Sequence, residues 1–505
     1  MINKTSRTRA AGKNLRANAA GIFINIFFSF FSRKIFVLVL GKEYVGLTSL
    51  IGNITVLISL FDFGSAAALT FKLYTAIAQN DTKKISSYLH YYRIFCIVSA
   101  ILTSLVGITI TPQLKKIVPD FSDTMTLYTV FLISIFSNAL EYFFSAEKLL
   151  LFADQKNYVT QLFSYAFGAI TLVIQSAALV VRASFPLYLA TGSALCILQD
   201  FLICRHVRKS YREIDFRLRG NFDKSCRKVL LREMLRLQPS NIAATISRTI
   251  DNFLVVSLFG VAQNGLYSNY NLLLGYAGML SVTFVSSISA GVGNLSVQAT
   301  KEHSQKVFGM ISLASFFLIN ICATLLFVMA GDIVTMWLGK SLVLPTGSSA
   351  VVAVCFFISA NRRTTIVFRD SFGLYSHEKL KPFAELLIFV ALAVICGIKY
   401  GLIGIYLAQA LSAVSVFWYE PYVLFKYGFG TSSRIYFKKF LVFVGCNLLS
   451  CYCAFNLCRC FDFIVLKAIV CVTVSVAFFI VMLANCEEAD LLKEKLKGKK
   501  KCRSI

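Results

Sequence analysis

The feature that most constrains this chain is a succession of long uncharged stretches separated by short polar and basic segments. About 20 apolar residues are enough for a helix to cross a bilayer, and fourteen stretches along the 505 residues approach or exceed that length. We expect transmembrane helices at residues 17–40, 47–71, 94–112, 126–146, 158–181, 185–204, 239–260, 271–299, 307–330, 342–360, 383–398, 401–419, 440–457 and 463–485. The sequence therefore predicts an all-α integral membrane protein with about 14 transmembrane helices.

The composition excludes a soluble multidomain enzyme. Hydrophobic residues make up 57% of the chain and charged residues only 15%, whereas soluble domains carry about 25% charged residues. A soluble protein of this length would lack the charged side chains needed to cover its surface.

The distribution of basic residues predicts the orientation. With a cytoplasmic N-terminus, 40 lysines and arginines fall in cytoplasmic segments, 8 fall outside and 3 lie within helices. Membrane proteins concentrate basic residues in their cytoplasmic loops, so both termini are expected in the cytoplasm. The first apolar run is too long for the core of a cleavable signal peptide. The same rule explains the net charge of +26 without a nucleic-acid partner.

The longest polar stretch predicts the domain organisation. We expect an N-terminal lobe of six helices at residues 1–204, a basic cytoplasmic linker at 205–238, a second six-helix lobe at 239–430, and two further helices with a basic tail at 431–505. A short repeat at an offset of 219 residues aligns Gly46-Leu47-Thr48-Ser49 with Gly265-Leu266-Tyr267-Ser268. This match is either chance similarity between apolar helices or the trace of two parallel repeats that enclose a cavity, as in one class of secondary transporter.

Cysteines are concentrated near the C-terminus. We interpret Cys446, Cys451, Cys453, Cys458, Cys460 and Cys471 as small apolar helix residues. A disulfide between Cys458 and Cys460 is the alternative, and no paired CxxC motif indicates a metal site.

Ionisable residues inside the predicted spans are the candidate functional residues. Such a group at mid-bilayer costs about 2.5–3.5 kcal/mol on insertion scales, so it needs a partner, a wet cavity or a route to the interface. Arg33 in the first span is placed either to line a cavity or to snorkel to the outer surface. Arg248 in the seventh span is either its cationic counterpart or the partner of Asp251, which lies at i+3 on the same helix face.

Two acidic residues complete the set of candidates. Asp62 in the second span is either an ion-coupling residue for H⁺ or Na⁺, or a helix-to-helix hydrogen-bonding group. Glu141 lies near the cytoplasmic end of the fourth span and is either interfacial or functional.

The chemistry of these groups leaves two substrate classes open. A phosphate or pyrophosphate head group needs guanidinium groups, whose donors match phosphate oxygens and whose charge does not titrate away. Organic cations need an acidic and aromatic pocket, for which the chain has Asp62 and 46 phenylalanines.

A set of short motifs carries a resemblance to a known family. They occur in this order: Gly41–Leu47, Asp62–Ala66, Tyr92-Arg93, Ser268–Tyr270, Ala290–Asn294, Met336–Gly339, Arg369-Asp370, Gly373–Tyr375 and Lys381-Pro382. Over roughly residues 8–430 the chain resembles the Wzx-type polysaccharide repeat-unit flippases of bacterial surface-polysaccharide loci. These flippases belong to the multidrug/oligosaccharidyl-lipid/polysaccharide (MOP) exporter superfamily.

The resemblance implies a fold and an activity. It implies two six-helix lobes arranged as in MATE exporters, two extra C-terminal helices, and alternating access that moves an undecaprenyl-pyrophosphate-linked oligosaccharide between leaflets of the bacterial cytoplasmic membrane. It also implies a cationic central cavity, for which Arg33 and Arg248 are the best-matching positions, and packing roles for Gly46, Gly64 and Gly293.

Three functions are therefore compatible with the sequence. The first is a lipid-linked oligosaccharide flippase that works as a monomer beside a polysaccharide polymerase and glycosyltransferases, in contact with membrane lipids. The second is a multidrug or organic-cation antiporter of the same superfamily. The third is a membrane polysaccharide polymerase or ligase, which the short external connections and the lack of a nucleophile–base constellation disfavour. We expect a transporter, not an enzyme, with no cofactor and no nucleotide-binding loop.

Overall fold

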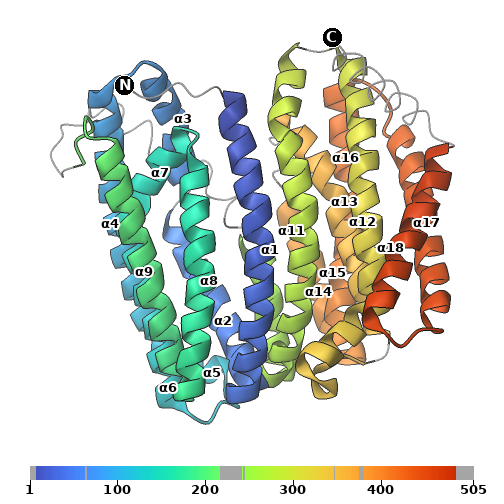
Figure 1. The fold of residues 1–505 in the computed structure, drawn as a ribbon, viewed down its shortest axis with the longest axis horizontal. Coiled ribbons are helices and arrows are strands. Elements are labelled where there is room, and N and C mark those ends of the chain that lie inside the picture. Colours follow the sequence, from blue (N-terminus) through green and yellow to red (C-terminus); the bar gives the residue numbers. More distant parts are fainter. Residues whose placement is uncertain are drawn as a thin grey trace. The chain divides into compact units, whose positions relative to one another are not determined.

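Every regular element that the structure describes is a helix (Figure 1). The computed structural model describes residues 7–62, 65–216, 242, 245–298, 300–345, 347–374 and 380–484. The elements of the first half are α1 (Arg7–Leu40), α2 (Lys42–Ile58), η1 (Ser59–Asp62), α3 (Ser65–Ala78), α4 (Thr82–Ile110), η2 (Thr111–Gln113), α5 (Leu114–Ile117), α6 (Thr124–Glu141), η3 (Tyr142–Phe144), α7 (Ser145–Ala153), α8 (Asn157–Val181) and α9 (Phe185–Ser210).

Residues 245–259 form a further helical segment. It is followed by α11 (Val261–Gln298), α12 (Lys301–Leu338), η4 (Lys340–Leu342), α13 (Ser348–Ser371), α14 (Lys381–Tyr400), α15 (Leu402–Phe417), α16 (Tyr419–Val423), the π-helix η6 (Leu424–Phe429), α17 (Arg434–Cys458) and α18 (Ile464–Ala484).

Many of these helices have the length and apolar character of membrane spans. Within the described ranges, ten helices are long and apolar enough to cross a bilayer, and a bent pair, Ile24–Leu40 with Lys42–Ile58, raises the number to eleven. The predicted spans 239–260 and 271–299 lie partly outside the residues or side chains that are described. The predicted class, an all-α membrane protein, is confirmed.

The second predicted span is broken. Residues 47–71 are divided among α2, the 3₁₀-helix η1 and α3, and residues 63 and 64 lie outside the described part. The Ser59 hydroxyl donates to the carbonyl of Val56 at 2.7 Å. The Ser59 carbonyl accepts a hydrogen bond from the hydroxyl of Tyr142 at 3.2 Å. A continuous apolar run in the sequence therefore does not guarantee a continuous helix.

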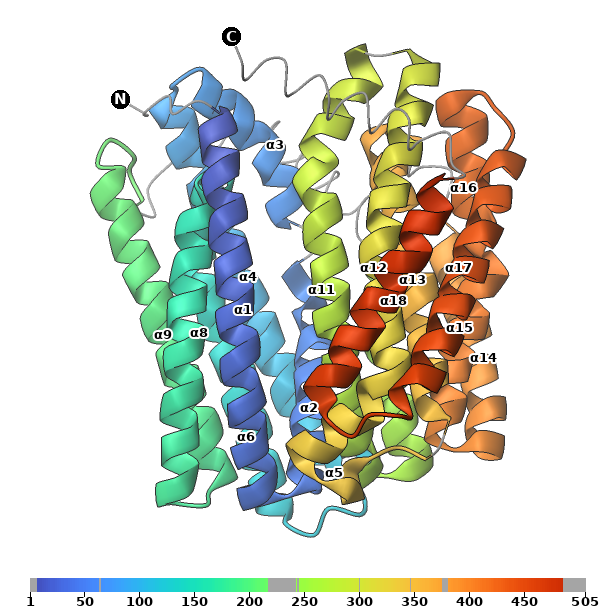
Figure 2. The same cartoon turned by 45° about the vertical axis from the view of Figure 1, so that its right-hand side comes forward.

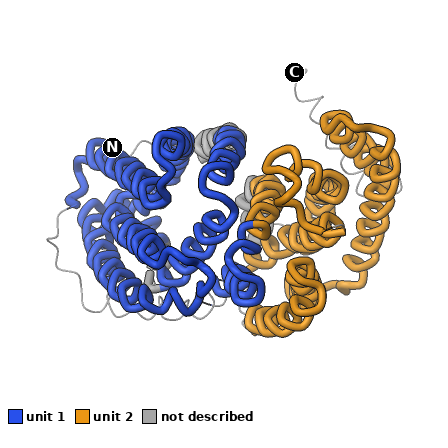
Figure 3. The backbone as a smooth tube through the Cα atoms, turned by 90° about the horizontal axis from the view of Figure 1, so that it is seen from below, with its two compact units in different colours: residues 1–265 blue, residues 266–505 orange. Residues whose placement is uncertain are grey.

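The chain divides into two compact units, Met1–Gly265 and Leu266–Ile505 (Figure 3). In unit 1, α1 packs along α8 and α8 along α9, while α6 packs against α9 and α4. One apolar core of unit 1 joins Leu50 of α2 to Val130 of α6 and Phe185 of α9. A second core joins Leu73 of α3 to Leu150 of α7. The predicted lobe boundaries stay a prediction.

Unit 2 is organised around α12. This helix packs against α13, α17 and α18, while α14 and α15 form an antiparallel pair (Figure 2). Aromatic rings fill much of its core, including Phe308, Phe368 and Phe429. The two C-terminal helices are therefore integral to the packing of unit 2.

The C-terminal cysteines lie in this helical packing. Cys446, Cys451, Cys458 and Cys471 are buried, and the sulfurs of Cys458 and Cys471 are 3.9 Å apart between α17 and α18. Cys458 and Cys460 are both free thiols, so the bridge weighed for them is not formed here.

Candidate functional site

The site is built on the sharp turn between α1 and α2. Gly41 has a φ of 89°, a left-handed backbone conformation that glycine adopts without the steric cost a side chain would bring. The adjoining helical parts meet at 120° there. This turn sends α2 back into unit 1, where its first two turns meet residues 245–265.

Two glycines allow the backbones to touch at this meeting. A Cβ atom at Gly46 would collide with the carbonyl oxygen of Val261, and one at Gly265 would collide with the carbonyl oxygen of Lys42. The buried Asn264 side chain donates from Nδ2 to the carbonyl of Gly46 at 2.9 Å. The contact is reciprocal, since Gly46 and Gly265, and likewise Lys42 and Val261, are separated by the 219 residues of the sequence repeat.

A chain of polar side chains begins one turn further along α2. The Ser49 hydroxyl donates to Oδ1 of Asn252 at 2.8 Å, and Nδ2 of Asn252 donates to Oδ1 of Asp251 at 3.1 Å. We call Ser49, Asn252 and Asp251 the α2 polar chain. It ties α2 to the helical segment 245–259, on which Arg248 lies one turn before Asp251.

The structure places the two predicted arginines on different helices of unit 1. Arg248 is exposed on the segment 245–259, and Arg33 is half-buried on α1. Arg33 and the buried Ser32 lie beside Tyr188 of α9, close enough to interact electrostatically or through hydrogen bonding with its hydroxyl. The joint lining of one cavity by both arginines stays a prediction.

The predicted acidic residues fall in different surroundings. Asp251 belongs to the α2 polar chain. Asp62 ends η1 at the break after α2, and its side chain lies outside the described part. Glu141 ends α6, partly exposed, and its carboxylate is near the ion pair of Lys148 with Asp200, whose charged atoms are 2.6 Å apart.

Sequence reasoning missed a buried ion cluster in unit 1. The carboxylate of Glu147 on α7 is 0% exposed. It accepts hydrogen bonds from Arg93 of α4 at 2.5 Å and from Arg208 of α9 at 2.9 Å. Arg93 also donates to the carbonyl of Phe216. These contacts join three helices at ends that the distribution of basic residues predicts to be cytoplasmic.

A second cluster was missed in unit 2. Arg362 of α13 donates to both carboxylate oxygens of Glu385 on α14, at 2.6 and 2.9 Å. The same guanidinium donates to both oxygens of Glu420 on α16, at 3.1 and 3.2 Å. Lys381 of α14 also donates to Glu420, which is buried. A bidentate guanidinium on each of two carboxylates fixes α13, α14 and α16 relative to one another.

Two glutamates were the only feature of the sequence that could have indicated these clusters. Glu147 and Glu420 each lie beside an apolar run, and a carboxylate that folds into a helix bundle needs cationic partners. Among the described residues, no group of three or more His, Cys, Asp or Glu side chains is arranged to hold a metal ion.

Comparison with known proteins identifies the fold of this chain through solved structures. No protein-family model matches the sequence, and no curated protein matches it. The lipid II flippase MurJ in an inward closed conformation has a TM-score of 0.66 and 14% identity, covering 95% of this chain and 99% of its own.

Drug exporters share the same architecture. A multidrug resistance MATE transporter of the MOP superfamily, in an inward-facing conformation, has a TM-score of 0.60 and 12% identity over 80% of this chain and 97% of its own. The MATE multidrug transporter DinF-BH has a TM-score of 0.60 and 14% identity over 84% of this chain and 98% of its own. This chain therefore has the multi-pass membrane fold of the MOP superfamily transporters, the fold common to MATE exporters and MurJ.

Proposed function

We propose that this protein is a flippase that moves undecaprenyl-pyrophosphate-linked oligosaccharide repeat units from the inner to the outer leaflet of the bacterial cytoplasmic membrane. Transport proceeds by alternating access, and the product is used to build a surface polysaccharide such as an O-antigen, capsule or exopolysaccharide.

The observation that carries this proposal is the extent of the fold likeness. MurJ, a flippase of a lipid-linked substrate, covers 95% of this chain, whereas the two exporters cover 80% and 84%. The difference in coverage is similar in size to the C-terminal part of the chain. Residues 431–505, which contain α17 and α18, are 75 of the 505 residues. The likeness to a lipid flippase that extends over nearly the whole chain supports a lipid-linked substrate.

The proposed substrate contacts are cationic. Arg33 and Arg248 each present a guanidinium, whose planar set of donors matches the oxygens of a pyrophosphate. The α2 polar chain holds the segment that carries Arg248 against α2 through the hydrogen bond of 2.8 Å from Ser49 to Asn252. Asp62, Asp251 and Glu141 are proposed as coupling or ion-pair residues for an H⁺ or Na⁺ gradient.

Deletion of the gene in its host tests the function. We expect loss of the surface polysaccharide and accumulation of undecaprenyl-linked repeat units in the cytoplasmic leaflet. Normal polymer without accumulation would remove this proposal. The neighbouring genes give a second test, because a flippase of this kind is expected beside glycosyltransferases and a polymerase.

Complementation of that deletion tests the arginines. Arg33→Ala and Arg248→Ala are expected to abolish polysaccharide export at normal membrane abundance, and the Arg→Lys variants to retain part of it because they keep the charge but not the donor fork. Lys34→Ala is the matched control, since Lys34 is adjacent to Arg33 and exposed. Full export by the alanine variants would show that these arginines do not contact the substrate.

An organic-cation antiporter is the second candidate, supported by the likeness to the two multidrug MATE transporters. It predicts that the purified protein in vesicles moves cationic dyes under an imposed ion gradient. It also predicts that the deletion strain keeps its surface polysaccharide.

A further inference from the structure

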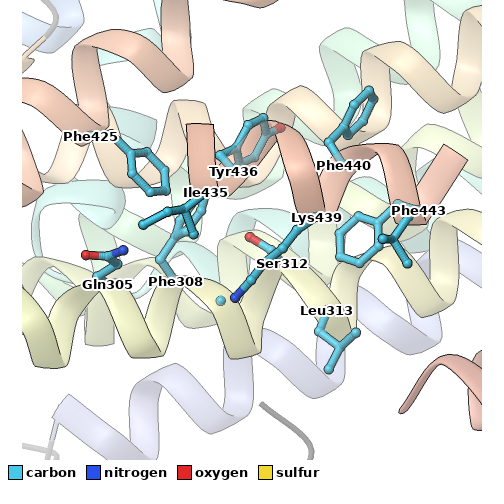
Figure 4. A pocket seen from close by; sticks show the side chains of 12 residues that line it. Gln305, Phe308, Ser312, Leu313, Phe425, Ile435, Tyr436, Lys439, Phe440 and Phe443 are labelled. Carbon is cyan, nitrogen blue, oxygen red and sulfur yellow. The ribbon is translucent and has the colours of Figure 1, made fainter. Parts of the chain in front are cut away.

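An apolar groove opens on unit 2 between α12, η6 and α17. Its volume is about 90 Å³, and its lining includes Phe308, Ser312, Phe425, Tyr436 and Phe440 (Figure 4). The lining belongs to residues 305–313 of α12, Phe425 of η6 and residues 435–443 of α17. No residue of its lining belongs to the α2 polar chain or to either ion cluster.

Packed rings fix the walls of the groove. The ring of Phe308 lies 5.7 Å from that of Phe425, and the ring of Tyr436 stacks on Phe440 at 6.1 Å. Phe443 of the lining stacks on Phe316 of α12 at 4.2 Å. Because these rings hold one another, the groove is a formed feature and not a gap that side chains would readily fill.

One side of the groove faces outward. Ile435 and Val442 line it and are 43% and 52% exposed. On a helix that crosses a membrane, exposed apolar residues of this kind face lipid chains. The groove is therefore accessible to a hydrocarbon chain from the bilayer.

The one charged side chain among the described residues that line the groove is Lys439. Figure 4 shows it reaching from α17 toward α12, between Phe308 and Leu313. Residues 300–313 and 424–443, which contain the lining, hold six lysines and arginines against one glutamate, Glu302. Lys439 therefore gives the lining of the groove a charge that is complementary to a phosphate.

We propose that this groove binds an anionic glycerophospholipid from the leaflet that the positive-inside rule assigns to the cytoplasm. One acyl chain lies along Phe308, Ser312 and Phe440, and the lipid phosphate contacts the ammonium of Lys439. The Ser312 hydroxyl is buried in the groove without a hydrogen-bond partner, so an apolar chain beside it displaces no hydrogen bond. This inference goes beyond the proposed transport activity and does not depend on it.

The test measures lipid binding to the delipidated full-length protein by native mass spectrometry. Phosphatidylglycerol and phosphatidylcholine with identical acyl chains are compared on the wild type, Lys439→Gln, Lys438→Gln and Ser312→Leu. The wild type is expected to prefer phosphatidylglycerol, and Lys439→Gln to lower that affinity about five-fold. Lys438→Gln is the matched control, because it removes the same charge from the adjacent exposed residue outside the lining.

Filling the groove separates the chain contact from the charge contact. Ser312→Leu, with an unchanged melting temperature, is expected to weaken both lipids because the acyl chain loses its space. Equal losses in Lys439→Gln and Lys438→Gln, equal binding of the two lipids by the wild type, or unchanged binding in Ser312→Leu would overturn the proposal. Preferential displacement of phosphatidylglycerol by undecaprenyl phosphate would also overturn it, because the groove would then serve an isoprenoid lipid.

Discussion

Units 1 and 2 each bury a carboxylate between two cations, but the two clusters differ in charge and exposure. Glu147 in unit 1 is held by Arg93 and Arg208. Glu420 in unit 2 is held by Arg362 and Lys381. Unit 2 adds a second carboxylate, Glu385, on the same arginine. The cluster of unit 2 is thus formally neutral, whereas that of unit 1 has one positive charge in excess.

The two clusters also differ in how far their cationic side chains are exposed to solvent. The side chain of Arg208 is 53% exposed, whereas those of Arg362 and Lys381 are 11% and 8% exposed. Removing one partner of a buried ion pair is costly because the remaining charge stays desolvated. An exposed partner contributes less, since water already screens it. We therefore expect unit 2 to tolerate changes in its cluster less well than unit 1.

The largest effect is expected for Arg362→Ala. It removes four hydrogen bonds to Glu385 and Glu420 and should lower the free energy of unfolding by about 3–5 kcal/mol, measured by denaturant unfolding in detergent. Arg363→Ala, at the adjacent exposed residue, should change it by less than about 0.5 kcal/mol. Equal losses in the two variants would show that the cluster does not stabilise unit 2.

A smaller effect is expected for Glu147→Gln. The amide keeps the shape of the carboxylate but removes its charge, so Arg93 loses its ionic partner. Arg208 is half-exposed and can be hydrated instead. We expect a loss of about 2 kcal/mol in the same unfolding assay, within the range for hydrogen bonds to charged groups. Glu43→Gln, at an exposed residue of α2, serves as the control. A loss as large as that of Arg362→Ala would contradict the ranking of the units.

The smallest effect is expected for Arg208→Ala. Arg93 still holds the buried carboxylate, and a half-exposed ion pair contributes about 1 kcal/mol or less. The comparison variant is Arg93→Ala, which removes the more buried partner and should cost more. If unfolding shows the reverse order, exposure does not determine the tolerance of this cluster.

The sequence was sufficient for the fold class because membrane helices are encoded by composition over long windows. Uncharged runs indicated α8, α9 and α12, and the structure has these helices. It was not sufficient for the ion clusters, because the helices extend past the apolar runs. α9 continues to Ser210 and α13 to Ser371, so Arg208 and Arg362, which were assigned to loops, lie on helices and reach buried carboxylates.

The hydrogen bonds of uncharged side chains could not be predicted from the sequence either. The carbonyl of Ser59, just after α2, accepts a hydrogen bond from the hydroxyl of Tyr142, a residue that is distant in sequence. The α2 polar chain depends on Ser49 and Asn252, uncharged residues that a search for intramembrane charges passes over. Of the predicted site residues, Asp251 belongs to the α2 polar chain, and Arg33 and Arg248 lie in unit 1. Their common role remains to be tested by the complementation experiment.

The touching glycines impose a condition on how this chain can change over evolutionary time. Gly46 faces the carbonyl of Val261 just as Gly265 faces that of Lys42, so a single distance between two main chains serves both positions. A larger residue at either one would push the opposite main chain away and leave the other glycine without its close contact. Selection for that distance therefore acts on both glycines at once, and the pair should persist longer than the side chains around it.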